Sequence, residues 1–571
     1  MKGSEAICEV LEKTGMKYVF GIPGGAVRYV FDALYNYKSR INCNLIRHEQ
    51  VASVMAEVVG RITGKPGVFM AQGPFAGSTG GFGIMTAYLA SSPMVVITDF
   101  SERTRFAQLG EFQVGTGDYG GYDLLQICKS MCKYTTEATT PVEAFRGLLL
   151  AHKHATTGRP GPTCLLLREP AVLGEFEEEL AVPSSVIQGL VGSAIPRLHA
   201  DDAYKIASLL LQAKSPVIIA GNGAHVSHCY DGIRKLAEEW GVPVATSFLG
   251  KSVLPENHDW SLGAMGTFGQ QTANKWVSGA DVILVLGCRL SPTEMCRCST
   301  KFVDPKRQAI IQIDIEPRNI GWVYPVAVSG VSDIGSAVEE ILKAGNQIRI
   351  NDLNSRRAKR LSILSELKKE NHFFYSPRME VQTQPVPPQQ VPKALQNVLT
   401  SQDLVLCDAG NNRFWMGYYF QCQGPGTFLA PGALAGMGWA VPAAVAAKLI
   451  LKEREVVAVC GDGGMSMSLP ALLTAFDLNL PVKIIVMNDS LLGMVRQQQD
   501  KRVICSEFRP TDFASICKAM GGEGITILHS NELEEGLREA VRCDVPTVVD
   551  IKINTEDSIF KELLSPMAKE E

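Results

Sequence analysis

The stretches EVVAVCGDGGMSMS (residues 455–468) and LPVKIIVMNDSLLGM (residues 480–494) decide the fold of the C-terminal part of this chain. Each contains a run of β-branched and other apolar residues, which predicts a buried strand. The first strand ends in Gly461-Asp462-Gly463-Gly464 and the second in Asn488-Asp489-Ser490. Because the carboxyl ends of parallel strands meet at one edge of a sheet, we expect these two turns to be neighbours.

The two turns have the chemistry of a phosphate and metal site. Glycines let backbone N–H groups approach a phosphate closely, and a helix starting near Ser468 would point its positive end there. The carboxylates of Asp462 and Asp489 can hold a hard divalent cation that keeps oxygen ligands from a diphosphate or water. The alternative interpretation is a pair of ordinary tight turns without a ligand.

Short apolar runs alternate with helix-compatible stretches in three segments, which predicts an α/β protein with parallel sheets. The segments cover residues 1–175, 195–345 and 391–556. We expect two outer α/β domains flanking a central Rossmann-like domain.

The connections between these segments differ in character. Residues 182–197 contain Pro and Ser, and residues 346–390 combine a charged helix with a Pro-rich stretch that predicts a linker. The polar tail from Asn554 onward is expected to be frayed.

Bulk properties exclude several classes of protein. With 571 residues, 46% hydrophobic and 20% charged residues and a net charge of −4, the chain is expected to be globular, without bulk affinity for nucleic acid or membrane. The N-terminus mixes charged residues into its apolar positions, which argues against a signal peptide, and we expect a cytoplasmic protein. The fifteen cysteines are scattered, and we interpret them as small buried hydrophobic residues.

Gly-Asp-Gly, a gap of about 25 residues and an Asn-Asn or Asn-Asp pair together resemble the binding signature of thiamine diphosphate (ThDP) enzymes. The resemblance implies a pyrimidine-binding domain at 1–175 and a diphosphate-binding domain at 391–556. It also implies that Asp462, Asp489 and the backbone carbonyl of Leu491 bind Mg²⁺. Relatives often have Asn at position 489, and the extra charge of Asp489 should tighten the metal site.

The order Arg-His-Glu-Gln at residues 47–50 looks like the family helix whose glutamate bonds the aminopyrimidine ring, so Glu49 is the catalytic candidate. FLAPGALAGMGWAV resembles the segment that props the cofactor, with Met437 as the wedge and the carbonyl of Ala435 as an acceptor. Asn411 and Asn412 replace Gln and His of relatives. The cofactor contacts implied by the resemblance are Gly24, Gly25, Gly410, Asn411, Asn412, Ala435, Met437, Gly461, Gly463, Gly464 and Met494.

In this family the glutamate and the metal site that meet belong to two subunits. The resemblance therefore implies a homodimer as the smallest active unit, or a homotetramer.

Further matches, including AYLASSPMVVIT (residues 87–98) and TTGRPGPT (residues 156–163), resemble the acetolactate synthase large subunit. That enzyme decarboxylates pyruvate and transfers the two-carbon unit to a second 2-oxo acid. Phe75 stands where relatives have Gly, and Gln498 where they have Trp, so the acceptor pocket should differ. We expect Phe75, Gln113 and Gln498 to line it.

Acetolactate synthases also bind FAD in the central domain. Arg289, Asp314 and Glu316 match positions that contact the flavin, but Phe268 replaces a His and Ser291 an Asp, so FAD remains an open question. Other functions also stay open: a ThDP-dependent lyase, decarboxylase or C–C hydrolase acting on another 2-oxo acid, a 2-hydroxyacyl-CoA or a diketone, a flavin-coupled oxidase, or a catalytically inactive relative.

Overall fold

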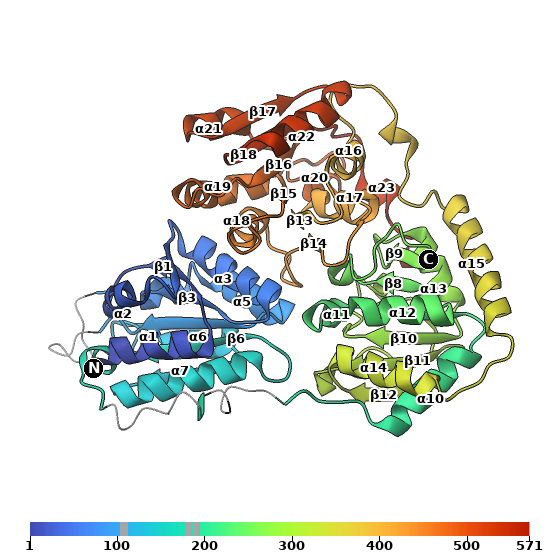
Figure 1. Ribbon diagram of the computed structural model, residues 1–571. Coiled ribbons are helices and arrows are strands. Elements are labelled where there is room, and N and C mark those ends of the chain that lie inside the picture. Colours follow the sequence, from blue (N-terminus) through green and yellow to red (C-terminus); the bar gives the residue numbers. More distant parts are fainter. Residues whose placement is uncertain (103–111, 178–185, 188, 190–193, 570–571) are drawn as a thin grey trace. The chain divides into compact units, whose positions relative to one another are not determined.

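The computed structural model describes residues 1–102, 112–177, 186, 187, 189 and 194–569, and it contains three six-stranded parallel sheets flanked by helices (Figure 1). The predicted α/β class is therefore confirmed. Much of the predicted connection at 182–197 lies outside the described residues. The chain forms two compact units: unit 1 comprises Met1–Ala194, Pro431–Lys452 and Gly464–Val482, and unit 2 comprises Ile195–Ala430, Glu453–Gly463 and Lys483–Glu571.

The first sheet lies in unit 1 and has the strand order β2-β1-β3-β4-β6-β5. Its central strands β3 and β4 are buried at every residue, because helices cover both faces of a parallel sheet. The strands are β1 (Tyr18–Ile22), β2 (Asn42–Leu45), β3 (Gly67–Ala71), β4 (Met94–Asp99), β5 (Tyr134–Ala138) and β6 (Pro162–Leu167). The helices are α1 (Gly3–Thr14), α2 (Arg28–Ala33), α3 (Glu49–Thr63), α4 (Gly73–Gly77), α5 (Gly81–Ala90), α6 (Leu124–Met131), α7 (Pro141–Thr156) and α8 (Glu169–Leu173).

The central sheet lies in unit 2 and has the order β12-β11-β10-β7-β8-β9. Read from β9, this is the 3-2-1-4-5-6 order of a Rossmann domain, as the sequence predicted. The strands are β7 (Pro216–Ala220), β8 (Val244–Thr246), β9 (Ser261–Ala264), β10 (Val282–Leu286), β11 (Ala309–Asp314) and β12 (Val328–Val331). The helices are α10 (Ala200–Gln212), α11 (Asn222–Val226), α12 (Tyr230–Trp240), α13 (Gln271–Gly279), α14 (Ile334–Gly345) and α15 (Leu353–Glu370).

The third sheet, also in unit 2, has the order β14-β13-β15-β16-β18-β17 and so repeats the topology of the first. The strands are β13 (Leu404–Cys407), β14 (Phe428–Leu429), β15 (Val456–Gly461), β16 (Lys483–Asn488), β17 (Glu523–Ile527) and β18 (Thr547–Lys552). The helices in this part of the sequence are α16 (Gln390–Val398), α17 (Asn411–Tyr419), α18 (Ala440–Ile450), α19 (Asp462–Asp477), α20 (Gly493–Arg496), α21 (Phe513–Ala519), α22 (Leu533–Arg542) and α23 (Ile559–Glu562). Of these, α18 and most of α19 belong to unit 1.

Helix α18 belongs to unit 1, where it packs against α3. The carboxylate of Glu57 on α3 is fully buried and accepts hydrogen bonds from the indole of Trp439 (3.1 Å) and the hydroxyl of Ser92 (2.6 Å), and it pairs with Arg61 (2.7 Å). A buried carboxylate requires such partners. Glu57 therefore has a structural role on the helix that begins with the catalytic candidate Glu49.

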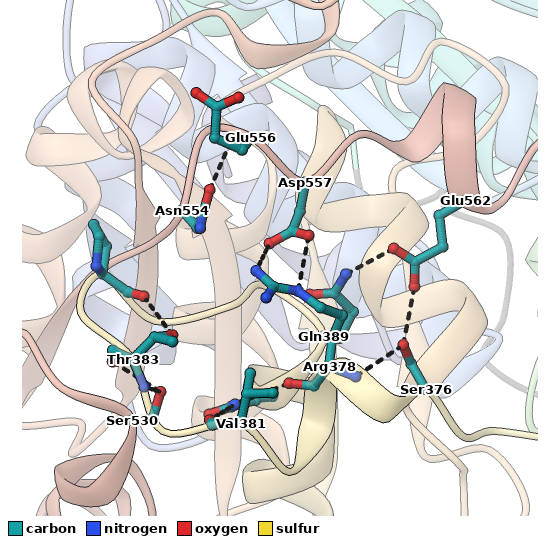
Figure 2. Close-up of polar contacts among 12 residues, drawn as sticks. Ser376, Arg378, Val381, Thr383, Gln389, Ser530, Asn554, Glu556, Asp557 and Glu562 are labelled. Atoms are coloured by element: carbon teal, nitrogen blue, oxygen red, sulfur yellow. Dashed lines mark hydrogen bonds and ion pairs between the residues drawn. The ribbon is translucent and has the colours of Figure 1, made fainter.

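Residues 554–569 of the tail pack on the rest of unit 2, so the expectation of a frayed tail from Asn554 onward is wrong for these residues. Ile559 and Leu563 are buried in the core of the third domain. Figure 2 shows the cause: Arg378 in the connection makes a two-pronged ion pair with Asp557, and Gln389 donates to Glu562 at 2.7 Å. This ion pair and this hydrogen bond hold the Pro-rich connection and the tail together, although Arg378 and Asp557 are 179 residues apart in sequence.

Helix α15 is held against the central domain by Arg360, which is only 3% exposed. Its guanidinium donates to the carbonyls of Ala213 (2.5 Å) and Lys214 (3.2 Å) after α10, and to those of Trp240 and Gly241 (both 3.1 Å) at the end of α12. A cation at two helix C-termini is favourable, although desolvation lowers the pKa of Arg360.

We expect Arg360→Ala to destabilise the central domain by about 3 kcal/mol, because it leaves several buried carbonyls without a donor. The exposed Lys359 on the same helix provides the matched control. Thermal unfolding should show a lower midpoint for Arg360→Ala and no change for Lys359→Ala. Equal midpoints for the two variants would contradict this account.

All fifteen cysteines are free thiols and most are buried, in agreement with their interpretation as small hydrophobic residues. Among the described residues, no helix combines the length and apolar character needed to cross a membrane.

Candidate active site

The predicted diphosphate site lies in unit 2 at the carboxyl ends of β13 and β15, where the strand order of the third sheet reverses direction. Ligands of open α/β sheets bind at such switch points. Gly410 follows β13, and Gly461 is the last residue of β15. Helix α19 begins at Asp462 itself and not near Ser468 as predicted, so the Gly-Asp-Gly turn already forms the start of the helix.

The two aspartates among the predicted metal ligands have the raised pKa values expected of a cation site without its cation. Burial raises the pKa of Asp462 to about 6. Burial and the nearby charge of Asp462 raise the pKa of Asp489 to about 7. Two desolvated carboxylates that repel each other are stabilised by a cation. In the part of the chain that the structure describes, no three His, Cys, Asp or Glu side chains are grouped to hold a metal. A cation held by the two aspartates would take its other oxygen ligands from a backbone carbonyl, a diphosphate or water.

The turn after β13 also fits a ligand. Gly410 has a φ of 107°, a conformation that side chains rarely allow, and it caps α17. The side-chain oxygen of Asn411 is buried without a hydrogen-bond partner. A Cβ at Gly493 would lie 2.6 Å from Nδ2 of Asn411 and 3.1 Å from Oδ2 of Asp489, so these two side chains approach the same point. An orphaned polar atom beside the carboxylate pair fits a hydrated cation and its diphosphate.

Asn412 occupies a different position from Asn411. It is buried, and its Nδ2 donates to the carbonyls of Asp408 (3.2 Å) and Val459 (3.3 Å). These carbonyls lie near the carboxyl ends of β13 and β15. Asn412 therefore links the two strands that carry the predicted diphosphate site. Its amide nitrogen is therefore engaged by the fold.

The segment after β16 is held by short antiparallel pairing. The N–H of Leu491 donates to Asp489 Oδ1 at 3.1 Å, and Leu491 pairs with Glu507. Met494 packs on the core of the third domain. Gln498 is exposed and donates to the carbonyl of Met494 at 2.8 Å, at the end of α20.

The predicted pyrimidine site lies in unit 1 at the equivalent switch point, between the ends of β1 and β3. The buried carboxylate of Asp99, the last residue of β4, accepts from the N–H groups of Ala26 and Gly73 (2.9 Å for Gly73). A Cβ at Gly25 would come within 2.1 Å of this carboxylate, and Gly25 has a φ of 50°. Glycine is thus required where the turn approaches Asp99.

Gln72 lies beside two predicted site residues, and sequence reasoning missed it. A Cβ at Gly24 would lie 2.7 Å from its side-chain oxygen, and its Nε2 donates to Gln113 (2.7 Å) and Ser101 (3.1 Å). The only signal for Gln72 in the sequence is its place directly after a predicted strand. Gln113, a predicted pocket residue, is therefore joined to the turn at Gly24. Phe75 is half-buried on α4, three residues after Gln72.

Glu49 is the first residue of α3, and His48 caps the helix by accepting from the N–H of Gln50. The Glu49 carboxylate is half-buried and accepts a hydrogen bond from the hydroxyl of Thr79 at 3.3 Å. Thr79 is the second residue that sequence reasoning missed.

The segment predicted to support the cofactor, residues 435–438, packs within unit 1 near the N-terminal end of α3. A Cβ at Gly436 would lie 2.2 Å from the ring of Phe82 on α5, and one at Gly438 would lie 3.5 Å from Nε2 of Gln50. Ala435 is exposed and has a φ of 49°, which is strained for alanine, and Met437 is half-buried. The structure thus places the 435–438 segment beside the residue that follows Glu49.

The residues proposed to contact a flavin lie at the carboxyl ends of β10 and β11. Arg289 is half-buried. Asp314 accepts from the N–H of Glu316 at 2.9 Å, and Glu316 is paired with Arg318 at 2.7 Å. Phe268 packs against Phe414 and Phe560, with ring centroids 4.4 and 5.8 Å apart. Both carboxylates are therefore engaged within the protein, and the question of FAD binding stays open.

Three family models match the chain: "Thiamine pyrophosphate enzyme, N-terminal TPP binding domain" over residues 1–115, "central domain" over 203–341, and "C-terminal TPP binding domain" over 408–551. The chain belongs to the thiamine pyrophosphate enzyme family. The predictions of this family and of a ThDP-dependent enzyme are thereby confirmed.

Similar relatives are acetolactate synthase large subunits. That of Methanocaldococcus jannaschii, named as probable, is 31% identical over 98% of this chain and 93% of its own length. The large subunit of Haemophilus influenzae is 30% identical, and the isozyme 3 large subunit of Escherichia coli 28%, each over 98% of this chain and 96% of its own length.

Proposed function

We propose that this protein is a ThDP- and Mg²⁺-dependent carboligase that decarboxylates pyruvate and transfers the two-carbon unit to a second 2-oxo acid. The observation that carries the proposal is the desolvated pair Asp462 and Asp489 at the switch point of the third sheet, in a chain similar over nearly all its length to acetolactate synthases.

The chemistry that ThDP supplies when bound is a nucleophilic thiazolium C2 and an electron sink for decarboxylation. Asp462, Asp489 and the carbonyl of Leu491 would hold Mg²⁺, while the turns at Gly410 and Gly461 would bind the diphosphate through backbone N–H groups. Met437 and Ala435 would orient the cofactor. Glu49 would bond the aminopyrimidine nitrogen and exchange a proton with it, which general acid–base catalysis requires within hydrogen-bond reach.

Phe75, Gln113 and Gln498 are proposed to line the acceptor pocket. Where relatives have an indole at 498, this chain has an amide, which is smaller and polar, and where they have a glycine at 75 it has a phenyl ring. The acceptor is therefore expected to differ in shape from that of the relatives.

Incubation with pyruvate, ThDP and Mg²⁺, followed by acidification, should yield acetoin from acetolactate. Omission of Mg²⁺ with a chelator present is the control. No acetoin, together with turnover of another 2-oxo acid, a 2-hydroxyacyl-CoA or a diketone, would replace the carboligase by a ThDP-dependent lyase, decarboxylase or hydrolase.

We further propose that the protein is cytoplasmic. We also propose that it forms a homodimer or homotetramer, because in the family the catalytic glutamate and the metal ligands of one site come from two subunits. Sedimentation in the presence of ThDP and Mg²⁺ tests this, and an active monomer would contradict it.

A further inference from the structure

We propose that Thr79 is a positioning residue that holds the carboxylate of Glu49 in its working orientation. The inference rests on the role proposed for Glu49. It adds a hydroxyl group to the catalytic apparatus, from a turn that contains none of the predicted site residues.

The direct observation is the hydrogen bond from Thr79 Oγ1 to Glu49 Oε2 at 3.3 Å. The same hydroxyl lies 3.1 Å from the carbonyl of Phe75, four residues earlier. A hydroxyl carries one proton, so the two acceptors compete for it. An ionised carboxylate is the stronger acceptor, and the proton is therefore expected to go to Glu49.

The position of Thr79 is set by close packing on both sides. A Cβ at Gly80 would lie 2.4 Å from the ring of Phe69 on β3. A Cβ at Gly83 would lie 2.3 Å from the backbone of Ser53 on α3, and the N–H of Gly83 donates to Ser53 Oγ at 3.2 Å. Gly80 lets the turn before α5 pack on β3, and Gly83 lets the first turn of α5 approach α3. Thr79 directly precedes Gly80, so these two close contacts set its position beside Glu49.

This arrangement has a chemical consequence. A glutamate side chain has several rotamers, and fixing one of them before the cofactor arrives favours the geometry needed for proton exchange. The neighbouring Ser78 makes the same i−4 contact, from Oγ to the carbonyl of Pro74 at 2.6 Å. No contact between Ser78 and Glu49 is seen among the described residues, so Ser78 is a matched control.

The test measures deuterium exchange at ThDP C2 together with ThDP affinity by calorimetry. Thr79→Val removes the hydroxyl at nearly constant volume and should slow exchange about 10-fold, the effect of losing one hydrogen bond to a charged group. The affinity for ThDP should stay within about twofold of the wild-type value, because Thr79 makes no proposed contact with the cofactor and no cofactor hydrogen bond is lost. Thr79→Ser should restore most of the rate, and Ser78→Ala should leave it unchanged.

Two further measurements separate positioning from general damage. In a Glu49→Gln background, Thr79→Val should cause no additional loss, because its effect passes through the carboxylate. A crystal structure of the cofactor-free Thr79→Val variant should show Glu49 turned away from its present orientation. An equal loss in both backgrounds, or an unmoved Glu49, would overturn the proposal.

The outcomes also separate this inference from the proposed function. If Glu49→Gln abolishes exchange and Thr79→Val does not change it, only the role of Thr79 fails. If Glu49→Gln itself leaves exchange unchanged, the proposed role of Glu49 fails, and the inference fails with it.

Discussion

Glu49→Gln should slow deuterium exchange at ThDP C2 by about 10³-fold or more, while ThDP binding remains measurable. An amide can still bond the aminopyrimidine ring but cannot exchange the proton, and general acid–base groups contribute about 10² to 10⁴ in rate. Glu49 begins α3 and its carboxylate contacts Thr79. Exchange followed by NMR in the presence of Mg²⁺, with affinity measured by calorimetry, gives both quantities.

Glu57 offers a matched control on the same helix. It is fully buried and bonded to Arg61, Ser92 and Trp439, so Glu57→Gln should lower the thermal midpoint. The rate of deuterium exchange at C2 per molecule of bound ThDP should stay close to that of the wild type. Unchanged exchange in Glu49→Gln would remove Glu49 from its catalytic role.

Replacing the acidic metal ligands is expected to have the second large effect. Asp462→Asn should weaken Mg²⁺-dependent ThDP binding by about 100-fold or more, since a direct carboxylate contact to the cation is lost. Asp489→Asn restores the residue that is common in relatives, so a smaller loss is expected. Calorimetric titration of ThDP at several Mg²⁺ concentrations measures both effects.

The raised pKa values also fix the sign of a pH dependence in the cation-free protein. Both carboxyl groups have folded-state pKa values above the usual 3.8, about 6 for Asp462 and about 7 for Asp489. The native state therefore binds additional protons, so their contribution to stability is complete below about pH 4 and is lost as the pH rises through 6 and 7. Mg²⁺ with ThDP should remove this decline.

Asp489→Asn should make the cation-free protein more stable near pH 7, because one of two repelling charges is removed from a desolvated site. Thermal unfolding of wild type and variant, with and without Mg²⁺, provides the comparison. A wild-type stability that is independent of pH between 4 and 8, or a less stable Asp489→Asn variant without cation, would contradict the electrostatic account of the pair.

The strands and the turns at the cofactor site could be predicted from the sequence because their signals are local. Apolar runs such as residues 456–460 mark buried strands, and Gly, Asp and Asn mark the turns that follow them. The family resemblance added the roles of Glu49 and Asp489, which remain predictions for this chain.

Other features could not be predicted because they depend on partners distant in sequence. The Pro-rich connection and the tail are held by Arg378 and Asp557, which are 179 residues apart. Asp99 closes the turn at Gly25, and Thr79 contacts Glu49 from 30 residues away. No local pattern reports such pairs.

By itself the sequence determined the α/β class, the family and the strand ends at which the cofactor groups are expected. It could do so because strand periodicity and turn residues are recognised from a few neighbouring residues. The tertiary structure alone decided which side chains bond to one another there: Asn412 to the strand ends, Gln72 to Gln113, and Thr79 to Glu49. The physical reason is that such contacts depend on the packing of whole helices and strands, which no single segment specifies.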